Sequence, residues 1–274
     1  MSRQTKCFVA VFCVLFAGCA KYNQPTIGKY TIEQGVLTVG VEVGYPPMEY
    51  FDTDGKTPTG FDIDLTKALA DKLGLEVKYI DTAWEGILAG VQTGKYDLAV
   101  NVTVLPERQK AMNFTKPYID NSMAIVLHKD SVINQSITVQ RPEDISGYRV
   151  AYQADTTAQY FTEKLSERGA IFSPFSYDKI LYCFNDLELH RVDFVVVDSL
   201  VAFDYAGKEN SRFIIGWQGI ADEVIGFCLK KGNDALTIAL NNAMDELFNE
   251  GVMLEISLKY FNCDMISSVR AEYW

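Results

Sequence analysis

Four places along the chain combine charged, hydroxyl and aromatic side chains in patterns that could carry binding chemistry. The first is GVEVGYPPMEY, where a strand carrying Glu42 ends in a Gly- and Pro-rich turn that presents Tyr45. Another is NVTVLPER, where Thr103 and Arg108 stand five residues apart, shortly after Asn101. A planar guanidinium binds a carboxylate with two hydrogen bonds, so Thr103 and Arg108 could share one carboxylate. Taken alone, Arg108 is better explained as a solvated surface residue.

The two remaining places follow predicted strands as well, and each has an ordinary structural explanation beside the functional one. Trp84 opens a helix, where a single tryptophan more often packs than binds. In QADTT, the segment from Gln153 through Asp155 to Thr156 ends a strand and starts a helix, whose free N–H groups attract an anion. The letters TTAQ also fit a capping box. The second part of this last place is Asp198, which directly follows an apolar strand and could equally be a helix N-cap.

The elements that must position these side chains alternate between strand and helix patterns. Ligands of open α/β sheets bind beyond the carboxyl ends of the strands, and all four places lie at such ends. The alternation predicts an α/β fold with two units, each built on a mostly parallel sheet. The sequence predicts strands at 36–43, 75–80, 96–100, 124–127, 148–152, near 171, 192–197, 213–215 and 224–229, and helices at 61–73, 84–92, 156–168, 179–189, 234–260 and from 106 and 199.

Composition excludes several classes of protein. The 274 residues contain 25 Lys and Arg against 36 Asp and Glu, a net charge of −11. A nucleic-acid-binding protein needs a basic face, so no nucleic acid is expected as a partner. Two histidines, His128 and His190, leave little room for a His-rich zinc site, and we expect neither a metal nor another cofactor. The length fits one large domain or two moderate ones.

The N-terminus has the pattern of a secretory signal. Its first six residues carry two cations and no acid, and the next ten are apolar, too few for a permanent membrane span. The letters LFAGC resemble a bacterial lipobox, in which cleavage precedes the cysteine and its sulfur is lipidated. We expect a signal peptide at 1–18 and a tether at 19–31 lipidated at Cys19; the alternative is an ordinary signal peptide cut near Ala20.

Removal of the signal peptide would change both the charge and the cysteine count. The mature chain would have 256 residues, 274 less 18, and a charge of −13 after the loss of Arg3 and Lys6. Cys183, Cys228 and Cys263 would remain as thiols, and their apolar neighbours predict that they are buried and unpaired. The protein is therefore expected outside the cytoplasm, in the periplasm or at the cell surface, held to the membrane only by its lipid.

In this order the motifs resemble family 3 of the bacterial extracellular solute-binding proteins, the polar amino-acid receptors of ABC importers. The resemblance runs from about Gly35 to Phe261. It implies a two-lobed periplasmic-binding-protein clamshell with two hinge strands, with one lobe formed by 32–125 plus 222–274 and the other by 126–221. It rests on GYPPMEY, GFDIDLTKALADKLG, GKYDLAV, PER, QADTTAQYF, RVDFVVVDS and LKYF.

The resemblance also implies a role for each matched residue. Tyr45 and Trp84 would stack on a free amino acid, and Asp198 would accept its α-ammonium. Thr103 and Arg108 would hold its α-carboxylate, helped by the helix start. Two departures from the family pattern are present: one residue is missing before Arg108, and an aspartate replaces the glycine before the Thr pair. The predicted ligand-binding residues are Glu42, Tyr45, Trp84, Asn101, Thr103, Arg108, Gln153, Asp155, Thr156 and Asp198.

The charges of this predicted site favour a cationic ligand. Glu42, Asp155 and Asp198 oppose one arginine, so an acidic ligand would be repelled. The pairing of Glu42 with Gln153 resembles the arginine receptors of the family, which makes arginine the first choice, then lysine or histidine, with glutamine as the neutral fallback. The ligand would bridge the lobes of a monomer and close them, and a cognate ABC permease would receive it.

Other functions on the same fold remain as alternatives. A periplasmic dehydratase acting on prephenate or arogenate has this clamshell, and either Glu42 or Asp198 could serve as its general acid. Its anionic substrate suits an acidic cleft poorly, so we expect no enzyme. A receptor lipoprotein that signals without transport is the further alternative. The fold also serves as a sensory module fused to other domains, but the sequence shows no such partner.

Overall fold

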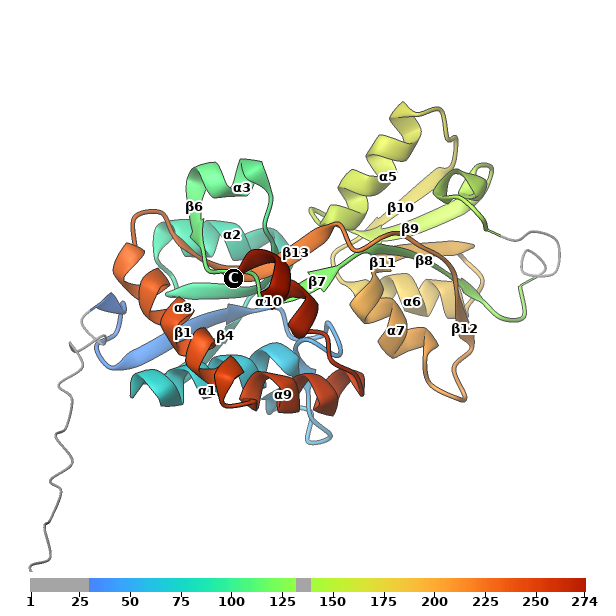
Figure 1. The fold of residues 1–274 in the computed structure, drawn as a ribbon. Helices are drawn as coiled ribbons and strands as arrows, with labels where there is room; N and C mark the ends of the chain where they lie inside the picture. Colours follow the sequence, from blue (N-terminus) through green and yellow to red (C-terminus); the bar gives the residue numbers. More distant parts are fainter. Residues whose placement is uncertain (1–29, 132–138) are drawn as a thin grey trace, which may run out of the picture.

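Two β-sheets, each covered by helices, organise the part of the chain that the structure describes, residues 30–131 and 139–274 of a computed structural model (Figure 1). We call the sheets with their helices the first and second lobe. This is the two-lobed α/β architecture expected from the sequence. The predicted signal peptide, the lipidation site Cys19 and nearly all of the tether lie outside the described residues. Within these ranges, no helix has both the length and the apolar composition needed to cross a membrane.

The first lobe takes its strands from both the first and the last part of the described chain. Its sheet has the order β4 (Glu76–Asp81), β1 (Val36–Val41), β5 (Leu98–Thr103), β13 (Glu223–Lys230) and β6 (Met112–Phe114), with β7 (Ile119–Asn121) also on β13. β1 runs parallel to β4 and β5, and β13 runs antiparallel to its neighbours. The remaining elements are α1 (Phe61–Leu73), α2 (Trp84–Thr93), α3 (Pro106–Ala111), α8 (Asp234–Asn249), α9 (Val252–Phe261), α10 (Ser267–Tyr273) and the pair β2 (Tyr50–Phe51) and β3 (Pro58–Thr59).

The second lobe is built from one continuous stretch of chain. Its sheet has the order β10 (Ser173–Tyr177), β9 (Arg149–Gln153), β11 (Phe194–Asp198), β8 (Met123–His128) and β12 (Phe213–Gln218). β9 runs parallel to β10 and β11, and β8 runs antiparallel to β11 and β12. Figure 1 shows the helix at Thr157–Glu167 on one face of this sheet and those at Ile180–Glu188 and Ser199–Ala206 on the other. The helices are α5 (Thr157–Glu167), α6 (Ile180–Glu188) and α7 (Ser199–Ala206), with a 3₁₀ turn at Pro142–Ile145.

Two adjacent segments join the lobes. The chain leaves the first lobe through β7 into β8 and returns from β12 into β13. β7 and β13 pair with each other, with Asn121 opposite Glu223 and Ile119 opposite Ile225. These are the two hinge strands expected from the sequence. The expected lobe boundaries, after residue 125 and before residue 222, stay a prediction. All of β8, which begins at Met123, pairs within the second sheet.

The residues after Phe261, for which the sequence suggested no role, form α10 against the hinge. The Trp274 indole donates to the Pro117 carbonyl at 2.7 Å, and the Ser268 hydroxyl donates to Asp120 at 3.1 Å. The Arg270 guanidinium lies 3.9 Å from the Phe248 ring centre. The tail of the chain therefore packs on the segment that leads into β7.

Several element boundaries differ from the sequence expectations for local physical reasons. α1 begins and ends as predicted, closed by Gly74 in the left-handed region. The single helix expected at 234–260 is two helices, because Gly251 has a φ of 81° and breaks the run. β5 begins at Leu98 instead of Tyr96. The carboxylate of Asp97 accepts from the Thr38 amide at 2.7 Å and its own amide donates to the Thr38 carbonyl at 2.9 Å, so residue 97 contacts β1 just before β5 begins. The expectation that all three thiols are buried is wrong for Cys263, which is exposed.

A tight contact around Tyr96 holds α2 on the first sheet. The Tyr96 ring is fully buried between Gly40 of β1 and Gly90 of α2. A side-chain methyl group added at either glycine would overlap the ring. The Tyr96 hydroxyl also donates to the Ile87 carbonyl of α2 at 2.5 Å. Because Trp84 begins the same helix, this contact also positions a residue of the predicted site.

We predict that Gly90→Ala lowers the free energy of unfolding by about 1–3 kcal/mol, because the added methyl overpacks the buried ring. Gly86→Ala is the matched control on the same helix, where the methyl would meet only the Thr82 side chain at 3.3 Å. It should stay within about 1 kcal/mol of wild type or gain stability from helix propensity. Urea unfolding followed by circular dichroism measures both variants, and equal effects would contradict the packing argument.

Candidate functional site

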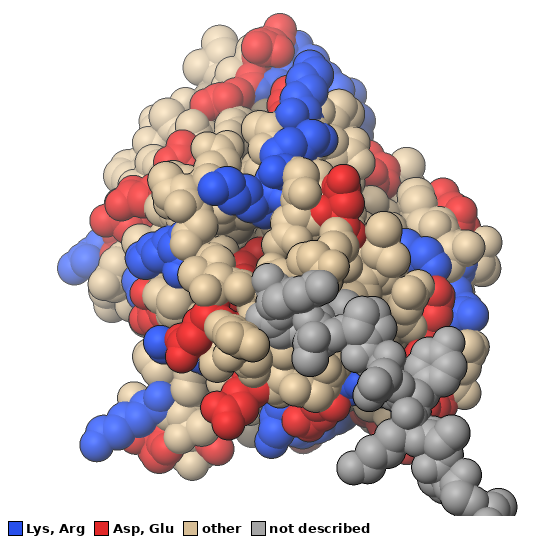
Figure 2. Space-filling view, turned by 90° about the vertical axis from the view of Figure 1, so that its left-hand side faces the viewer, with Lys and Arg blue, Asp and Glu red and all other residues tan. Residues whose placement is uncertain are grey.

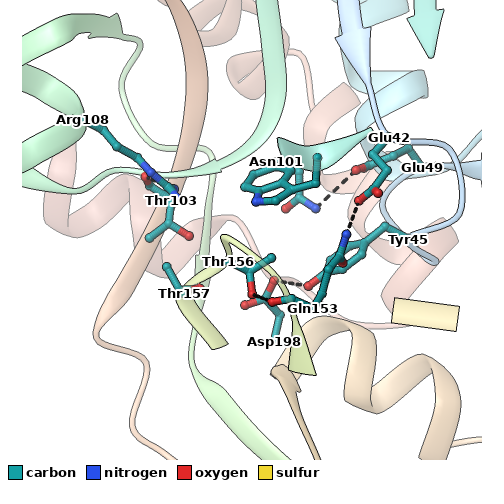
Figure 3. A pocket seen from close by; sticks show the side chains of 11 residues that line it. Glu42, Tyr45, Glu49, Asn101, Thr103, Arg108, Gln153, Thr156, Thr157 and Asp198 are labelled. Carbon is teal, nitrogen blue, oxygen red and sulfur yellow. Dashed lines mark hydrogen bonds between the residues drawn. The ribbon is translucent and has the colours of Figure 1, made fainter. Parts of the chain in front are cut away.

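A pocket with about 330 Å³ of empty space lies between the lobes. Nine of the ten predicted site residues line it, and Figure 3 shows their side chains converging from both lobes. Two further lining residues were not predicted. The pocket is lined by Glu42, Tyr45, Glu49, Trp84, Asn101, Thr103 and Arg108 from the first lobe and by Gln153, Thr156, Thr157 and Asp198 from the second.

The carboxyl ends of four strands supply most of this lining. Glu42 directly follows β1, and Thr103 is the last residue of β5. Gln153 and Asp198 are the last residues of β9 and β11 in the other lobe. Strands that run in parallel end at the same edge of a sheet, so each lobe presents its edge to the other. This is where the sequence analysis placed the four motifs.

Arg108 is the cation of the pocket. Only 7% of its surface is exposed. Its Nη1 donates to the Thr103 carbonyl at 3.1 Å, whereas its buried Nη2 has no hydrogen-bond partner among the described residues. Burial lowers its pKa, but a guanidinium still stays charged at neutral pH. The Trp84 ring lies 5.9 Å away. A buried cation with an unused donor is suited to bind an anion.

Asp198 is a half-buried acceptor on the opposite lobe. Its two oxygens accept from the Tyr45 hydroxyl at 2.5 Å and from the Asn121 amide at 2.7 Å. Burial raises the pKa of Asp198, and these two donors and the charge of Arg108 oppose the rise. Although Asp198 stands at the N-cap position of α7, its side chain makes no capping bond there. The alternative that Asp198 merely caps a helix is therefore wrong.

A second group of acceptors lines the pocket around Glu42. The Gln153 Nε2 donates to Glu42 Oε2 at 2.8 Å, and the Asn101 Nδ2 reaches Glu49 Oε1 at 3.4 Å (Figure 3). In the part of the chain described, three buried oxygens here lack a donor: Glu42 Oε1, Glu49 Oε2 and Gln153 Oε1. Burial raises the pKa of Glu42, opposed by the Gln153 bond and the charge of Lys179. Buried acceptors without donors are costly, so this end of the pocket is suited to a ligand rich in donors.

Asp155 is the one predicted residue that the structure does not bring to the pocket. Its side chain is exposed, and it lies outside the lining set. Its φ is 58°, a left-handed conformation that glycine adopts most readily and aspartate tolerates. Its contribution is the backbone carbonyl, which accepts from Trp84 Nε1 at 2.9 Å. The aspartate thus occupies a glycine-like turn position while its carboxylate faces solvent.

Glu49 and Thr157 are the lining residues that the sequence analysis missed. Glu49 stands in GYPPMEY itself, but a strand pattern gives no sign that the turn folds back on itself. The amides of Gly44 and Tyr45 both donate to the Glu49 carbonyl, at 3.0 and 2.8 Å, and this returns Glu49 to the pocket. Thr157 is the second threonine of the pair at the start of α5. Thr156 donates to the Gln153 carbonyl at 2.7 Å and makes no capping bond.

Three hydrogen bonds join the lobes directly across the pocket. They are the bonds from Tyr45 to Asp198, from Gln153 to Glu42 and from Trp84 to the Asp155 carbonyl. On the face drawn in Figure 2, acidic and basic side chains are interspersed. At the pocket, by contrast, three carboxyl groups, Glu42, Glu49 and Asp198, stand with one cation. No group of three His, Cys, Asp or Glu side chains within residues 30–131 and 139–274 is arranged to hold a metal ion.

Glu223, at the start of β13, adds a further carboxyl group close to Asp198. The Asn121 Nδ2 donates to Asp198 and lies 3.4 Å from Glu223 Oε2. Burial, with Asp198 and Asp222 as neighbouring negative charges, raises the pKa of Glu223 to about 7. The hinge therefore carries a carboxyl group that titrates near neutral pH.

Known proteins resemble the chain over most of its length. The family described as bacterial extracellular solute-binding proteins, family 3, matches residues 37–263. The L-cystine-binding protein TcyJ of Escherichia coli (strain K12) is 31% identical over 234 residues, which cover 85% of each chain.

Two solved structures share both the fold and a similar level of identity. An ancestral arginine-binding protein bound to arginine matches with a TM-score of 0.77 and 32% identity, over 83% of this chain and 98% of that one. An ancestral amino acid-binding protein described as a precursor of cyclohexadienyl dehydratase matches with a TM-score of 0.73 and 30% identity, over 83% and 95% of the two chains. Both are two-lobed α/β proteins like this one.

We predict that Glu223→Gln stabilises the protein at high pH. A carboxyl group whose folded pKa is raised from 4.5 to about 7 contributes stability below about pH 4.5 and loses it as the pH rises through 7. The variant should therefore exceed wild type by about 1–3 kcal/mol near pH 8 and by little near pH 5. Urea unfolding at both pH values measures this. The exposed neighbour provides the control Asp222→Asn, for which we expect a smaller change in unfolding free energy that differs less between the two pH values.

Proposed function

The chain belongs to family 3 of the bacterial extracellular solute-binding proteins, and we propose that it binds a cationic L-amino acid, arginine first, for delivery to an ABC importer. Lysine and histidine follow, with glutamine as the neutral fallback. The observation that carries the proposal is that the pocket has an unpaired hydrogen-bond donor at one end and unpaired acceptors at the other. A free donor on Arg108 is matched by free acceptors on Glu42, Glu49 and Gln153.

The charges of a zwitterion fit this division. Its α-carboxylate would take the free Nη2 of Arg108, together with the Thr103 hydroxyl and the start of α5. Its α-ammonium would bind Asp198, whose carboxylate already accepts two hydrogen bonds. The rings of Tyr45 and Trp84 would cover the aliphatic part. Each charge that leaves water would thus meet a fixed partner, without which burial costs several kcal/mol.

The far end of the side chain would then reach the acceptor group. A guanidinium has five N–H donors and no acceptor, which complements the three unpartnered oxygens. The glutamine side chain has an amide oxygen and only two N–H donors, so it would satisfy fewer of these three oxygens. A second α-carboxylate, as in cystine, would meet like charge there.

Ligand binding would favour the closed arrangement of the lobes. Arg108 lies in the first lobe and Asp198 in the second, so one ligand would bridge them. The permease would recognise the closed form. We propose that the protein acts as a monomer outside the cytoplasm, held to the membrane through a lipid on Cys19 and without enzymatic activity.

A dehydratase activity is the second candidate, favoured by the similarity to a precursor of cyclohexadienyl dehydratase and by Glu42. Burial raises the pKa of Glu42, as a general acid requires. A dicarboxylate such as prephenate would nevertheless bring negative charge beside Glu49. Release of phenylpyruvate from prephenate by the purified protein would establish this activity in place of the receptor function.

We predict that calorimetric titration with the twenty amino acids and cystine gives tightest binding for arginine. Glu42→Gln should weaken arginine binding by about 10–100-fold, since a hydrogen bond to a charged group contributes about 1.5–3 kcal/mol. It should change glutamine binding little. Tight binding of glutamate or of cystine, with no response to arginine or lysine, would overturn the cationic assignment.

Arg108→Lys should weaken every amino acid by a similar factor, because a lysine ammonium lacks the planar fork that binds a carboxylate at two points. The same titrations with arginine and glutamine measure this. Loss of arginine binding alone would show that Arg108 does not hold the shared α-carboxylate.

A further inference from the structure

Glu49 is paired with a second carboxyl group that lies behind the pocket. The amides of Phe61 and Asp62 donate to the Pro47 and Met48 carbonyls, at 2.9 and 3.0 Å, so the turn before Glu49 is fixed on the first turn of α1. The carboxyl groups of Glu49 and Asp62 are consequently close enough to share a hydrogen bond. Glu49 is 2% exposed and Asp62 is completely buried.

The hydrogen bonding of this pair is incomplete unless it holds a proton. Three of its four oxygens, Glu49 Oε2 and both oxygens of Asp62, are buried and lack a donor in good geometry within the described residues, although the neutral Tyr118 hydroxyl is close enough to Asp62 to lower its pKa through a hydrogen bond. Among the same residues, Glu49 Oε2 has no such neighbour. Two ionised carboxylates have no hydrogen to share, whereas one proton turns their contact into an O–H···O⁻ bond. The fourth oxygen, Glu49 Oε1, accepts from Asn101 Nδ2 at 3.4 Å. A shared proton therefore supplies the missing donor.

Within residues 30–131 and 139–274, no cationic side chain that could take the place of this proton lies next to the pair. The titratable groups that act on it are Glu42, after β1, and the tyrosines Tyr45, Tyr79 and Tyr118. Burial raises the pKa of each of these tyrosines, so they stay neutral. Burial and the facing carboxylate raise the pKa of Glu49 well above its usual value. Asp62 lies in the first turn of α1, whose dipole favours its charge, which leaves the proton on Glu49.

We propose that Glu49 is a specificity-determining residue that carries a proton shared with Asp62 and releases it when a cationic side chain occupies the acceptor end of the pocket. The inference rests on the proposed function and extends it. The O–H bond of Glu49 breaks, the electron pair stays on the carboxylate, and the proton passes to solvent. The ligand cation then faces Glu49 Oε2 and offsets the repulsion from Asp62.

Only a cation can bring about this release. A neutral side chain such as that of glutamine gives no compensation for a second buried negative charge, so the proton stays. Arginine affinity should thus rise with pH more steeply than glutamine affinity, since a ligand that releases a proton binds more tightly when protons are scarce. Arginine itself stays charged throughout this range.

Calorimetric titration of the full-length protein in two buffers with different ionisation enthalpies counts the protons released. We expect arginine to release up to about one proton more than glutamine, because any release through Glu223 beside the shared α-ammonium is common to both ligands. Arginine affinity should gain up to about tenfold per pH unit relative to glutamine affinity as the pH approaches about 7, the raised pKa of Asp62 in the pair. A proton count for arginine no larger than that for glutamine would overturn the inference while leaving arginine binding, and hence the proposed function, intact. If no amino acid binds, both fail.

Two variants locate the proton, and circular dichroism and thermal melting verify that they fold. Glu49→Gln should abolish the extra release and weaken arginine about 10–100-fold, with glutamine changed less than about threefold. Asp62→Asn removes the repulsion but not the burial, so the pKa of Glu49 should fall and arginine should release fewer protons than in wild type. The exposed Glu76→Gln is the matched control and should behave as wild type. Undiminished release in Glu49→Gln would assign the proton elsewhere and overturn the inference.

Discussion

Buried negative charge is the constraint on which this pocket depends. Glu42, Glu49 and Asp198 line it and Asp62 lies directly behind it, while one buried guanidinium, that of Arg108, stands among them. Donors from neutral groups offset part of this imbalance: the Tyr45 hydroxyl, the Gln153 amide and two asparagine amides. What these donors leave unsatisfied is the acceptor end of the pocket, where a donor-rich ligand is needed to complete the bonding.

The fold meets this constraint by dividing the charged groups between two lobes. Because the carboxyl ends of the strands face each other, each charged group reaches the pocket directly from the strand end or helix start that carries it. The bonds from Tyr45 to Asp198 and from Gln153 to Glu42 cross between the lobes and so depend on the lobes being together, whereas Asp198 also accepts from Asn121 of β7. The hinge strands β7 and β13 pair side by side, and α10 packs on the segment that leads into β7.

The sequence allowed much of the fold and most of the pocket to be predicted, because strand ends and helix starts leave local signals. α1 was predicted to the residue, since Gly74 stops it. Asp155 was placed wrongly because the residue type alone does not reveal the backbone φ, and a left-handed turn directs its side chain to solvent. Glu49 was missed for the opposite reason: its position depends on a turn that folds back and on contacts with α1. The tail helix depends on long-range contacts with Pro117 and Phe248, for which a sequence pattern offers no signal.

The three tryptophans of the chain occupy three mechanically different places. Trp84 donates its indole N–H across the pocket to the other lobe, Trp217 stacks on Phe161 inside the second lobe, and Trp274 lies against the hinge. Intrinsic fluorescence therefore carries three separate optical signals. Single-tryptophan versions of the protein would report lobe closure, the interior of one lobe and hinge movement independently, without an attached dye.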